Sequence, residues 1–560
     1  MKNFYITTPI YYVNSEPHIG GVYTTLMVDT ANRFKKLKGL NTRFLTGTDE
    51  HGQKLQQAAE KAGVKEQDFV DKYAKIFREA ADYMNFEYND FIRTTEKRHK
   101  DFVQRMWKKL VENGWLYKSK YSGWYCISDE AYYKEDELIK QEDGTFKTEI
   151  GKSVEWKEED SYFFRLSEFQ DILLDLYKNT DFIQPISRRN EVISFVSGGN
   201  LKDFEEGKYT KGFLQDLSVS RNNFSWGIKI PCDENNKNLL DENSDWLHNL
   251  KDEEKHVIYV WLDALFNYQS ALDSAGKFEE FWKNAEVVHF VGKDIIKFHT
   301  VYWPAFLIAV EYKREELKNI KLEEILDKNI LPTTVFAHGW WTNEGRKISK
   351  SFGNAISAQT EIEWLKNDFL IDEEIAKDYL KYYLITETTF GNDGDYSRAR
   401  LVEKINADLV NNIGNLVQRV LSMVYKNFDG IIENIKILDF KYQDELKNKT
   451  INKFDFQGYK DLIITIANIA NNYMEETTPW NLIKNNELKE AKEVLYKEIN
   501  YILQIAVLLQ VICPHIAKKI LDFLNIKERN FSILSDEKII IENIKIDKPD
   551  GFCPRLQIGK

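Results

Sequence analysis

Two short segments, far apart in the chain, hold the residues best suited to phosphate chemistry. Near the amino terminus, His18, Gly20 and Gly21 stand at the predicted start of a helix. Backbone N–H groups and the helix dipole attract anions there, and glycine lets a nucleotide approach the backbone closely. Far downstream, Lys347 and Lys350 lie in the run Lys-Ile-Ser-Lys-Ser, and two mobile ammonium groups can follow departing phosphates. Either segment alone is weak evidence for phosphate chemistry, because the first also fits a helix cap and the second also fits a solvated basic loop.

The elements around the first segment alternate between strand and helix. Residues 3–8 are rich in aromatic and β-branched types and predict a strand, and the apolar spacing that follows predicts a helix ending before Gly39. A second strand is predicted at 43–46. This alternation indicates an α/β fold with a Rossmann-like, doubly wound parallel sheet. Buried strands are expected to return at 256–261 and 287–291, so an inserted domain would split the sheet.

The carboxyl-terminal part of the chain reads as helical. Apolar residues between Leu401 and Val424 recur every three or four positions and predict a long helix, the first of an all-α bundle. The sequence therefore predicts the following regions: the first half of the sheet (1–116), an inserted connective domain (117–254), the second half of the sheet (255–335), a region holding the lysine loop (336–395), a helical bundle (396–540) and a tail (541–560).

Composition narrows the class of protein. The 560 residues are 43% hydrophobic and 14% aromatic, which favours several packed domains over disorder. The cysteines, Cys126, Cys232, Cys513 and Cys553, form no Cys-x-x-Cys pair, so neither a disulfide framework nor a zinc site is expected. A net charge of −12 neither supports nor excludes a nucleic-acid partner, since phosphate contact needs only a local basic face. The amino terminus lacks the apolar core of a signal peptide, and no segment predicts a membrane span, which favours the cytoplasm.

Together the two segments resemble the signatures of class I aminoacyl-tRNA synthetases, His-Ile-Gly-His and Lys-Met-Ser-Lys-Ser in that family. Here Gly21 stands at the second histidine and Ile348 at the methionine. The resemblance implies ATP-dependent activation of an amino acid and its transfer to tRNA, with Mg²⁺ arriving with ATP. It assigns catalysis to His18, Lys347 and Lys350, and ATP binding to these three and to Gly20, Gly21, Gly292, Lys293 and Asp294, with Asp294 on the ribose. A dinucleotide fingerprint is absent from the sequence, which argues against a nicotinamide cofactor.

Further stretches narrow the resemblance to the methionyl branch of that family. They include Thr46 to Gly52, Val260 to Ala264 and Gly292 to His299. The resemblance implies that Asp49 pairs with the ammonium of L-methionine and that a pocket encloses the thioether, lined by Ile10, Tyr12, Trp261, Ala264, Tyr268, Phe298 and His299. Sulfur packs well against aromatic edges, which agrees with such a pocket. Taken singly, Trp261 fits core packing and Asp49 fits a turn or helix cap.

The same resemblance gives roles to the insertion and the bundle. The family's insertion often carries zinc knuckles, but the matching stretch here holds Cys126 alone, so no zinc is expected. The bundle would read the CAU anticodon of tRNA(Met) by stacking and hydrogen bonds, through Asn411, Asn415, Arg419, Pro479 and Trp480. Without the resemblance, the asparagines equally fit a solvated helix face. A monomer is expected, because the chain stops without an evident appended tRNA-binding module.

Two alternatives stay open at this point. The first is a class I synthetase for leucine, isoleucine, valine or cysteine, although the first three branches usually carry a larger insertion and the cysteine branch needs zinc ligands that the sequence lacks. The second is a tRNA-binding paralogue that has lost catalysis, which Gly21 motivates. The strength of homocysteine editing does not follow from the sequence.

Overall fold

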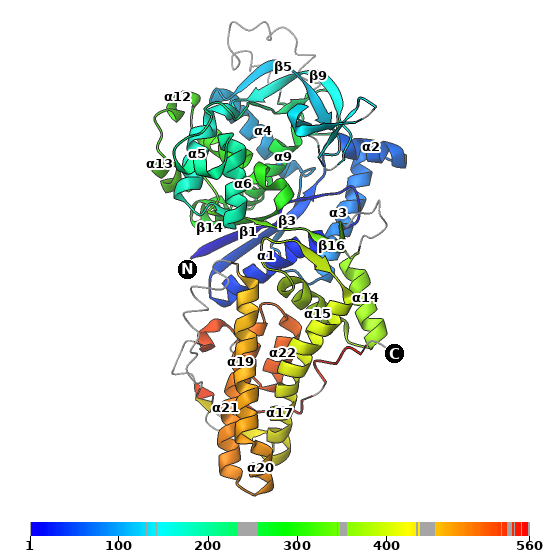
Figure 1. Cartoon of the computed structure of the whole chain (residues 1–560), viewed down its shortest axis with the longest axis vertical. Helices are drawn as coiled ribbons and strands as arrows, with labels where there is room; N and C mark the ends of the chain where they lie inside the picture. The colour runs from blue at the N-terminus through cyan, green and yellow to red at the C-terminus, as the bar shows by residue number, and fades with distance from the viewer. Residues whose placement is uncertain are drawn as a thin grey trace.

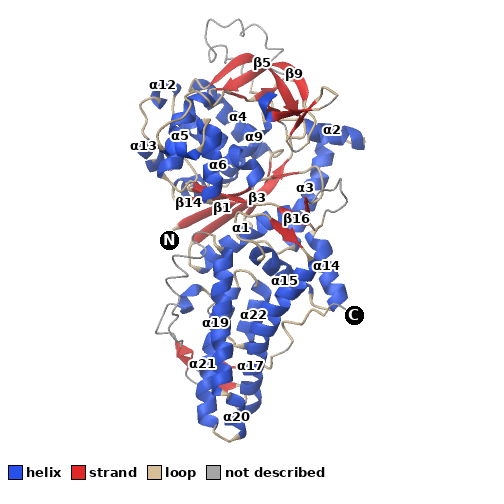
Figure 2. Cartoon of the chain, viewed as in Figure 1, coloured by secondary structure: helices blue, strands red, loops and turns tan. Residues whose placement is uncertain are grey.

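The fold was analysed in a computed structural model, in which an elongated molecule carries a sheet at its middle, the insertion at one end and a helical bundle at the other (Figure 1). Strands concentrate in the sheet and the insertion, whereas helices make up most of the opposite end (Figure 2). The structure describes residues 2–129, 131–133, 135–141, 143–149, 151–231, 256–343, 345–347, 356–432, 435–436, 454–527, 529–534, 540–541, 544–549 and 551–557.

A parallel sheet forms the centre of the molecule. Its strand order is β10-β15-β14-β1-β3-β2, with β4 also paired to β3, and every pairing is parallel. This topology confirms the predicted Rossmann-like α/β fold. Because the carboxyl ends of parallel strands meet along one edge, a ligand crevice is expected there. The strands are β1 (Asn3–Thr7), β2 (Tyr11–Tyr12), β3 (Asn41–Asp49), β4 (Asp90–Arg93), β10 (Ile183–Gln184), β14 (Ala285–Gly292) and β15 (Thr334–His338).

The sheet separates two hydrophobic cores. Successive side chains of a strand point to opposite faces, so Phe4 and Ile6 of β1 pack with α1 and the bundle, while Tyr5 packs with the helices of the other face. The helices of the sheet region are α1 (Ile19–Leu37), α2 (Gln53–Ala62), α3 (Glu66–Tyr83), α4 (Lys97–Glu112), α9 (Val260–Leu265), α10 (Asn267–Ser274), η5 (Glu279–Lys283), η6 (Lys293–Ile295), η7 (Phe298–Tyr302), α11 (Trp303–Glu311), α12 (Arg314–Leu317) and α13 (Leu322–Asp327).

The insertion is built on a long antiparallel pair, β5 with β9, which β6 and β11 extend. One strand from its range, β10, joins β15 of the parallel sheet instead. The elements are β5 (Leu116–Cys126), β6 (Ala131–Tyr133), η1 (Glu135–Glu137), β7 (Leu138–Lys140), β8 (Phe146–Thr148), β9 (Glu155–Phe164), η2 (Leu166–Phe169), α5 (Gln170–Asn179), α6 (Ile186–Ser197), α7 (Leu201–Glu205), β11 (Leu217–Ser218) and β12 (Ser220–Arg221).

The strand predicted at 256–261 is wrong in extent and in place. Only β13 (Val257–Ile258) is a strand, it pairs antiparallel with β12 outside the parallel sheet, and α9 begins at Val260. A short apolar run cannot distinguish a buried strand from a buried helix by its pattern alone. The strand predicted at 287–291 is confirmed as the centre of β14.

Beyond the sheet, the described chain is mainly helical, which confirms the predicted bundle. A small sheet of β16, β17 and β18 lies at the junction, and a continuous helical column of α16, a π-helical segment and α17 leads away from it. The elements are β16 (Trp341–Asn343), β17 (Arg346–Lys347), α14 (Ala358–Phe369), α15 (Glu373–Thr386), β18 (Gly394–Tyr396), α16 (Arg398–Lys404), η9 (Ile405–Gly414), α17 (Asn415–Asn427), β19 (Ile431–Ile432), β20 (Ile435–Lys436), α19 (Phe456–Thr477), α20 (Pro479–Lys484), α21 (Leu488–Leu509), α22 (Pro514–Phe523), η11 (Phe531–Leu534), β21 (Ile540–Ile541) and β22 (Ile544–Lys545).

A buried carboxyl joins α15 to α22. Asp378 of α15 accepts a hydrogen bond from the backbone N–H of Ile516, in the first turn of α22, at 2.8 Å. Burial raises the pKa of Asp378 to about 7, and the ammonium of Lys381 opposes that rise. The tail packs back on the column, where Asn406 exchanges hydrogen bonds of 2.7 and 3.0 Å with the backbone of Leu556.

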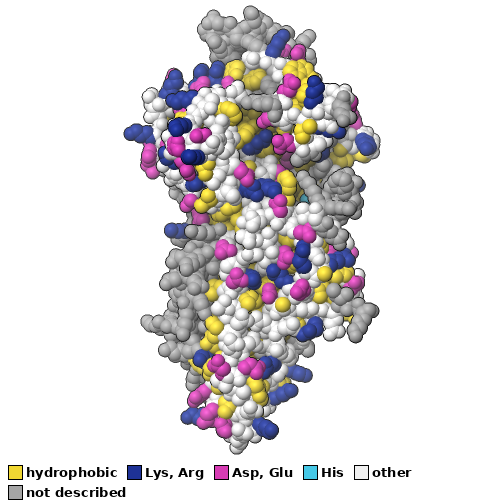
Figure 3. Space-filling view, in the orientation of Figure 1, with side chains coloured by type: hydrophobic (Ala, Val, Ile, Leu, Met, Phe, Trp, Pro, Cys, Tyr) yellow, Lys and Arg dark blue, Asp and Glu magenta, His cyan; other side chains and the backbone are white. Residues whose placement is uncertain are grey.

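Acidic and basic side chains are mixed over the face drawn in Figure 3. Among the described helices, none is long and apolar enough to cross a bilayer.

Candidate active site

A cavity of about 800 Å³ lies where the central strands of the parallel sheet end. A narrow extension of about 30 Å³ adjoins it, lined by Ala264, Tyr268 and His299 among others. Together they gather most of the residues predicted for catalysis, ATP and methionine: Ile10, Tyr12, His18, Gly20, Gly21, Asp49, Trp261, Ala264, Tyr268, Gly292, Lys293, Asp294, Phe298 and His299. A larger and more open groove, about 1430 Å³, lies between α5 and α12 and contains none of the predicted residues.

The lysine loop is only partly described. Lys347 lies in β17, and its backbone pairs with Thr342 of β16. Thr342 follows the cavity-lining Trp340 by two residues. The side chain of Lys347 and the whole of Lys350 lie outside the described residues. The backbone thus approaches the cavity wall, and the convergence of the lysines with His18 stays a prediction.

His18 caps the helix that carries it. It has extended backbone angles, φ −109° and ψ 170°, and its imidazole accepts a hydrogen bond from the N–H of Gly20. That bond is 3.1 Å long and ends on Nδ1, so the neutral ring carries its proton on Nε2. Accepting side chains are the preferred N-caps because they satisfy a backbone donor that the helix leaves unpaired.

A second histidine, which sequence analysis missed, lines the same cavity as His18. The His338 Nδ1–H donates to the carbonyl of Gly339 at 2.7 Å, so Nε2 accepts the hydroxyl proton of Thr24 at 2.9 Å. Burial lowers the pKa of His338, which keeps the ring neutral. This bond links β15 to α1 at the mouth of the cavity. The sequence analysis predicted no strand at 334–338, so no signal pointed to His338.

Two aromatic rings form one wall of the predicted side-chain pocket. Trp261 of α9 and Phe298 of η7 stack with ring centroids 3.6 Å apart and planes within 3° of parallel. A Phe–Trp pair in such a stack presents its polarizable edges and faces to whatever occupies the cavity, and sulfur favours aromatic edges.

Next to this stack, the pocket is lined by two polar but uncharged side chains. The His299 Nδ1–H donates to the carbonyl of Ile295 at 3.0 Å, so its Nε2 accepts the hydroxyl proton of Tyr268 at 2.7 Å. Burial lowers the pKa of His299 to about 4, and burial also raises the pKa of Tyr268 well above its ordinary value. Both side chains are therefore neutral at physiological pH.

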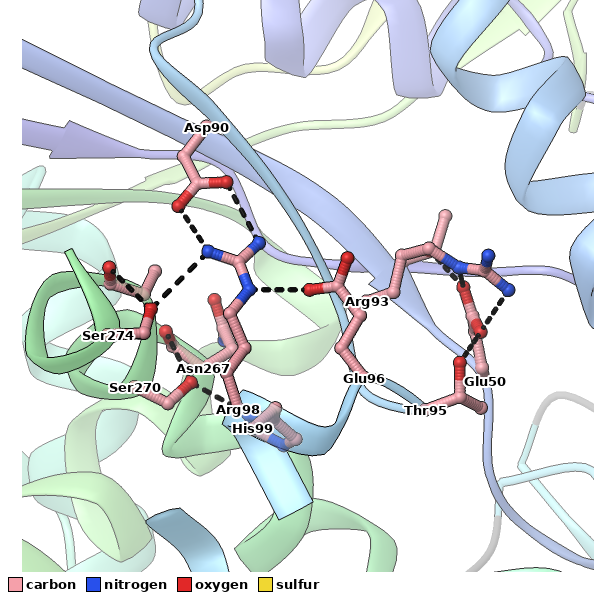
Figure 4. A network of polar contacts seen from close by, with 12 residues as sticks. Glu50, Asp90, Arg93, Thr95, Glu96, Arg98, His99, Asn267, Ser270 and Ser274 are labelled. Carbon is pink, nitrogen blue, oxygen red and sulfur yellow. Dashed lines mark hydrogen bonds and ion pairs between the residues drawn. The ribbon is translucent and has the colours of Figure 1, made fainter. Parts of the chain in front are cut away.

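Asp49 ends β3, and the residue after it is held by a dense polar network. The fully buried Glu50 carboxylate accepts from Thr95 at 2.5 Å and from Arg93 at 2.7 and 2.9 Å (Figure 4). It also accepts from the Thr48 hydroxyl at 2.5 Å. Burying an ion pair is favourable only when its lone pairs are satisfied, as they are here. The network therefore fixes the backbone that carries Asp49.

The predicted ATP residues Lys293 and Asp294 already have protein partners. The Lys293 ammonium contacts Asp393 at 2.7 and 2.8 Å and lies 4.3 Å from the ring centre of Trp340. The Trp340 indole N–H donates to Asp294 at 3.1 Å. Partial burial would raise the pKa of Asp393, but Lys293 and the backbone of Trp340 lower it. Trp340 and Asp393 were not predicted, and neither belongs to a recognisable local motif.

The turn of the insertion that faces the cavity is organised around a carboxylate. Asp129 forms an ion pair with Lys152 and accepts from the Tyr133 hydroxyl at 2.8 Å and from the Cys126 thiol at 3.4 Å. Burial raises the pKa of Cys126. In the described part of the chain, three or more His, Cys, Asp or Glu side chains are nowhere grouped so as to hold a metal ion.

The predicted anticodon residues lie at the far end of the bundle. The Arg419 guanidinium lies 4.9 Å from the ring centre of Trp480 and pairs with Glu475 at 3.0 Å. Asn415 is exposed on the same helix, and Pro479 precedes Trp480 in α20. Asn411 lies one turn earlier, in the π-helical segment, and accepts a hydrogen bond from Arg555. The structure thus brings Arg419 and Trp480 into contact and places the asparagines along one helical column.

Comparison with known proteins places the chain in one class of enzymes, and that class agrees with the geometry of the cavity. A family model described as "tRNA synthetases class I (M)" matches residues 4–142 and 143–421. The matched span covers the parallel sheet, the insertion, the cavity and the beginning of the bundle.

Full-length relatives define the family within that class. The chain is 43% identical to the methionine–tRNA ligase of Rickettsia felis over 577 residues, covering 100% of the chain and 99% of that relative. It is 37% identical to the methionine–tRNA ligase of Fusobacterium nucleatum, covering 100% of the chain and 81% of the relative. The structure of Mycobacterium tuberculosis methionyl-tRNA synthetase in complex with methionyl-adenylate matches with a TM-score of 0.83 and 34% identity, covering 99% and 100% of the two chains. The chain belongs to the methionine–tRNA ligase family of class I tRNA synthetases, which confirms the resemblance drawn from its signatures.

Proposed function

We propose that the chain activates L-methionine with ATP to form methionyl-adenylate and then transfers the methionyl group to the 3′-terminal adenosine of tRNA(Met). One observation carries this proposal. A single cavity with its narrow extension contains both the capped helix start at His18, suited to phosphate, and the Trp261–Phe298 stack beside His299, suited to a thioether.

Activation is an in-line displacement at phosphorus. A carboxylate oxygen of methionine attacks the α-phosphorus, the bond to the bridging oxygen of the β-phosphate breaks, and pyrophosphate leaves with that electron pair. His18, whose proton lies on Nε2, donates to a phosphate oxygen, and Gly20 and Gly21 let the nucleotide reach the helix start. Lys347 and Lys350 complete the charge around the pyrophosphate, and Mg²⁺ arrives with ATP, whose phosphate oxygens bind it.

ATP must compete with protein partners for its other contacts. Asp294 binds the ribose in this proposal and presently accepts from Trp340, and Gly292 leaves room for that carboxylate. Lys293, held by Asp393, lies beside it. Trp340 and Asp393 therefore orient the two nucleotide-binding side chains before ATP arrives.

Methionine is bound at its two ends. Asp49 pairs with the ammonium, and the thioether enters the pocket formed by Ile10, Tyr12, Trp261, Ala264, Tyr268, Phe298 and His299. The neutral imidazole of His299 and the Tyr268 hydroxyl give sulfur a weak polar contact without burying a charge. An apolar pocket discriminates between amino acids that differ by one methylene by only about 1–3 kcal/mol. Methionine is therefore selected both by the shape of the pocket and by the distance between the pocket and Asp49.

Transfer and tRNA selection use the rest of the molecule. A ribose hydroxyl of the terminal adenosine attacks the carbonyl carbon of methionyl-adenylate, the bond from that carbon to the phosphate oxygen breaks, AMP leaves with the electron pair, and the hydroxyl proton passes to solvent. At the far end, Trp480 offers a stacking plane for an anticodon base, with Asn411, Asn415, Arg419 and Pro479 around it. Since Arg419 covers Trp480 in the free protein, a base must displace the guanidinium to stack there.

The boundaries of the predicted regions, a metal-free insertion, a cytoplasmic location and a monomeric state stay predictions from the sequence. The single Cys126 and the Lys152–Asp129 ion pair support the metal-free turn, because one thiol does not make a four-ligand zinc site.

Two assays on purified protein test the proposal. Pyrophosphate exchange is measured with methionine, leucine, isoleucine, valine and cysteine, and charging is measured with a tRNA that carries CAU. Methionine alone should support exchange. Trp480→Ala should leave exchange unchanged and lower charging about 5- to 150-fold, the equivalent of about 1–3 kcal/mol for a lost base stack. Exchange with another amino acid in preference to methionine would reject the assignment, and the absence of any adenylate would favour a tRNA-binding paralogue without catalysis.

A further inference from the structure

A fully buried carboxylate lies between two buried histidines behind the methionine pocket. Asp263 Oδ2 lies 2.7 Å from His51 Nδ1, and Asp263 Oδ1 lies 2.7 Å from His99 Nε2. The side chains of Asp263 and His99 are 0% exposed and that of His51 is 5% exposed. None of these three residues has a role in the proposed chemistry.

The three residues come from elements that hold opposite ends of the substrate site. His51 lies two residues after Asp49, the proposed ammonium partner. Asp263 lies in α9 between Trp261 and Ala264, which line the side-chain pocket. Asp263 therefore connects the loop that holds one end of the substrate to the helix that holds the other.

His99 fixes Asp263 from behind. It lies in the first turns of α4, and its Nδ1 is 2.8 Å from the hydroxyl of Ser270 in α10 (Figure 4). The Ser270 hydroxyl is also 3.2 Å from the carbonyl of Asn267. With one ring nitrogen on Asp263 and the other on Ser270, the imidazole has no freedom to rotate without losing a buried hydrogen bond.

The segment that carries His99 also holds Glu50. Arg93 and Thr95 bind the Glu50 carboxylate directly (Figure 4). His99 is connected to His51 through Asp263. Residues 93–99 therefore fix both residues that follow Asp49. Within the same segment, Arg98 is paired with Asp90 of β4 at 2.8 and 2.9 Å. This ion pair anchors residues 93–99 to the parallel sheet.

The charge state of Asp263 suits this connecting role. Burial would raise the pKa of Asp263, but the two histidines together hold it below its ordinary value. An ionised carboxylate accepts one N–H on each oxygen, and charge-assisted hydrogen bonds of this kind are short and strongly directional. The two distances of 2.7 Å fit that description.

We propose that Asp263, held between His51 and His99, is a specificity-determining positioning residue that sets the span between Asp49 and the thioether pocket. This inference rests on the proposed function. Since the substrate is bound at its ammonium and at its side-chain end, a fixed span selects the length of the side chain. An amino acid one carbon longer or shorter than methionine can then place its ammonium at Asp49 or its side-chain end in the pocket, but not both.

The test compares the network with a buried histidine elsewhere. His99→Gln retains an amide donor for Asp263 but loses the rigid link to Ser270, and Asp263→Asn retains an acceptor for only one histidine. His256→Gln is the matched control, because His256 is also buried, contacts Ser220 of the insertion at 3.1 Å and is not among the residues that line the substrate cavity. Pyrophosphate exchange is measured for methionine, for ethionine, which is one carbon longer, and for homocysteine, which is one carbon shorter.

In wild type, methionine should exceed both analogues in kcat/KM. In His99→Gln and Asp263→Asn the preference for methionine over ethionine should narrow about tenfold, the equivalent of about 1.4 kcal/mol. KM for methionine should rise while KM for ATP stays constant, and His256→Gln should keep the wild-type preference.

The opposite result separates a purely structural role. If His99→Gln and Asp263→Asn lower the melting temperature and the amount of active enzyme but keep the preference within twofold of wild type, the inference is wrong. If Asp263→Asn fails to fold, the preference measured in His99→Gln decides alone. Failure of the wild-type protein to exchange with methionine would instead overturn the proposed function on which the inference rests.

Discussion

Adjacent glycines at the start of α1 provide a test of the role of His18. A β-carbon placed on Gly20 would lie 2.9 Å from Cε1 and 3.1 Å from Nδ1 of His18, whereas one placed on Gly21 would meet only the Tyr11 ring, at 3.6 Å. Gly20→Ala must therefore displace the imidazole that caps the helix, while Gly21→Ala makes an ordinary van der Waals contact. Both changes replace glycine by alanine in the first turn of the same helix.

The magnitudes separate stability from catalysis. Alanine should stabilise either position by about 1 kcal/mol relative to glycine. At residue 20, loss of the His18 cap costs about 1 kcal/mol, so the melting temperature should change little. Loss of a phosphate donor aimed at the transition state costs about 10²–10³ in kcat, or about 2.7–4 kcal/mol. Gly20→Ala should therefore be a folded enzyme with about 1% of wild-type kcat or less.

Methionine-dependent pyrophosphate exchange and a melting curve on the same preparation measure both quantities. In Gly21→Ala the imidazole of His18 is not moved, so any loss of kcat should be at least tenfold smaller than in Gly20→Ala, and crowding of the nucleotide by the added methyl group should appear as a raised KM for ATP. The reasoning fails if Gly20→Ala retains more than about a third of wild-type kcat, or if kcat falls equally in the two variants.

Two further predictions concern pH and metal. Because the pKa of buried Asp378 is raised to about 7, the folded state binds that proton more tightly than the unfolded chain, and the associated stability is lost as pH rises from about 4 to 7, at about 1.4 kcal/mol per pKa unit. Asp378→Asn still offers an oxygen to the Ile516 N–H. Its melting temperature should fall less between pH 5 and pH 8 than that of wild type, and an equal fall in the two proteins would contradict this prediction. Dialysis against a strong zinc chelator should leave the melting temperature and exchange activity unchanged, because Asp129 and Lys152 neutralise each other in the turn beside Cys126; a drop in either that zinc restores would show a structural metal.

Local sequence patterns were sufficient where an element is determined by its own residues. The spacing of apolar residues after His18 predicted α1, and the β-branched run before Pro9 predicted β1. The same reasoning failed at 256–261, where an uninterrupted apolar run carries no period and α9 begins at Val260. Short elements of two residues, such as β10, exist only because a distant strand pairs with them.

The site followed the same division. Residues within recognisable motifs, including Asp49, Trp261 and His299, were predicted and do line one cavity. Trp340 and Asp393 were missed because their importance lies in contacts with Lys293 and Asp294, residues distant in sequence. No local pattern at either position distinguishes such a side chain from a solvated one, since a tertiary contact leaves no period in the sequence.

Residues 398–427 form one uninterrupted helical column, α16 through the π-helical segment into α17, about 45 Å long at about 1.5 Å per residue. Its first turn is tied to the small sheet that contains β17, since Arg400 pairs with Asp395 at 3.0 Å. Adding or deleting a single residue within it would turn everything downstream by about 100° about the axis. Arg419 would then leave Trp480 although every helical hydrogen bond could re-form. The length of this column, unlike that of the loops at either end, therefore sets how Arg419 is oriented toward Trp480.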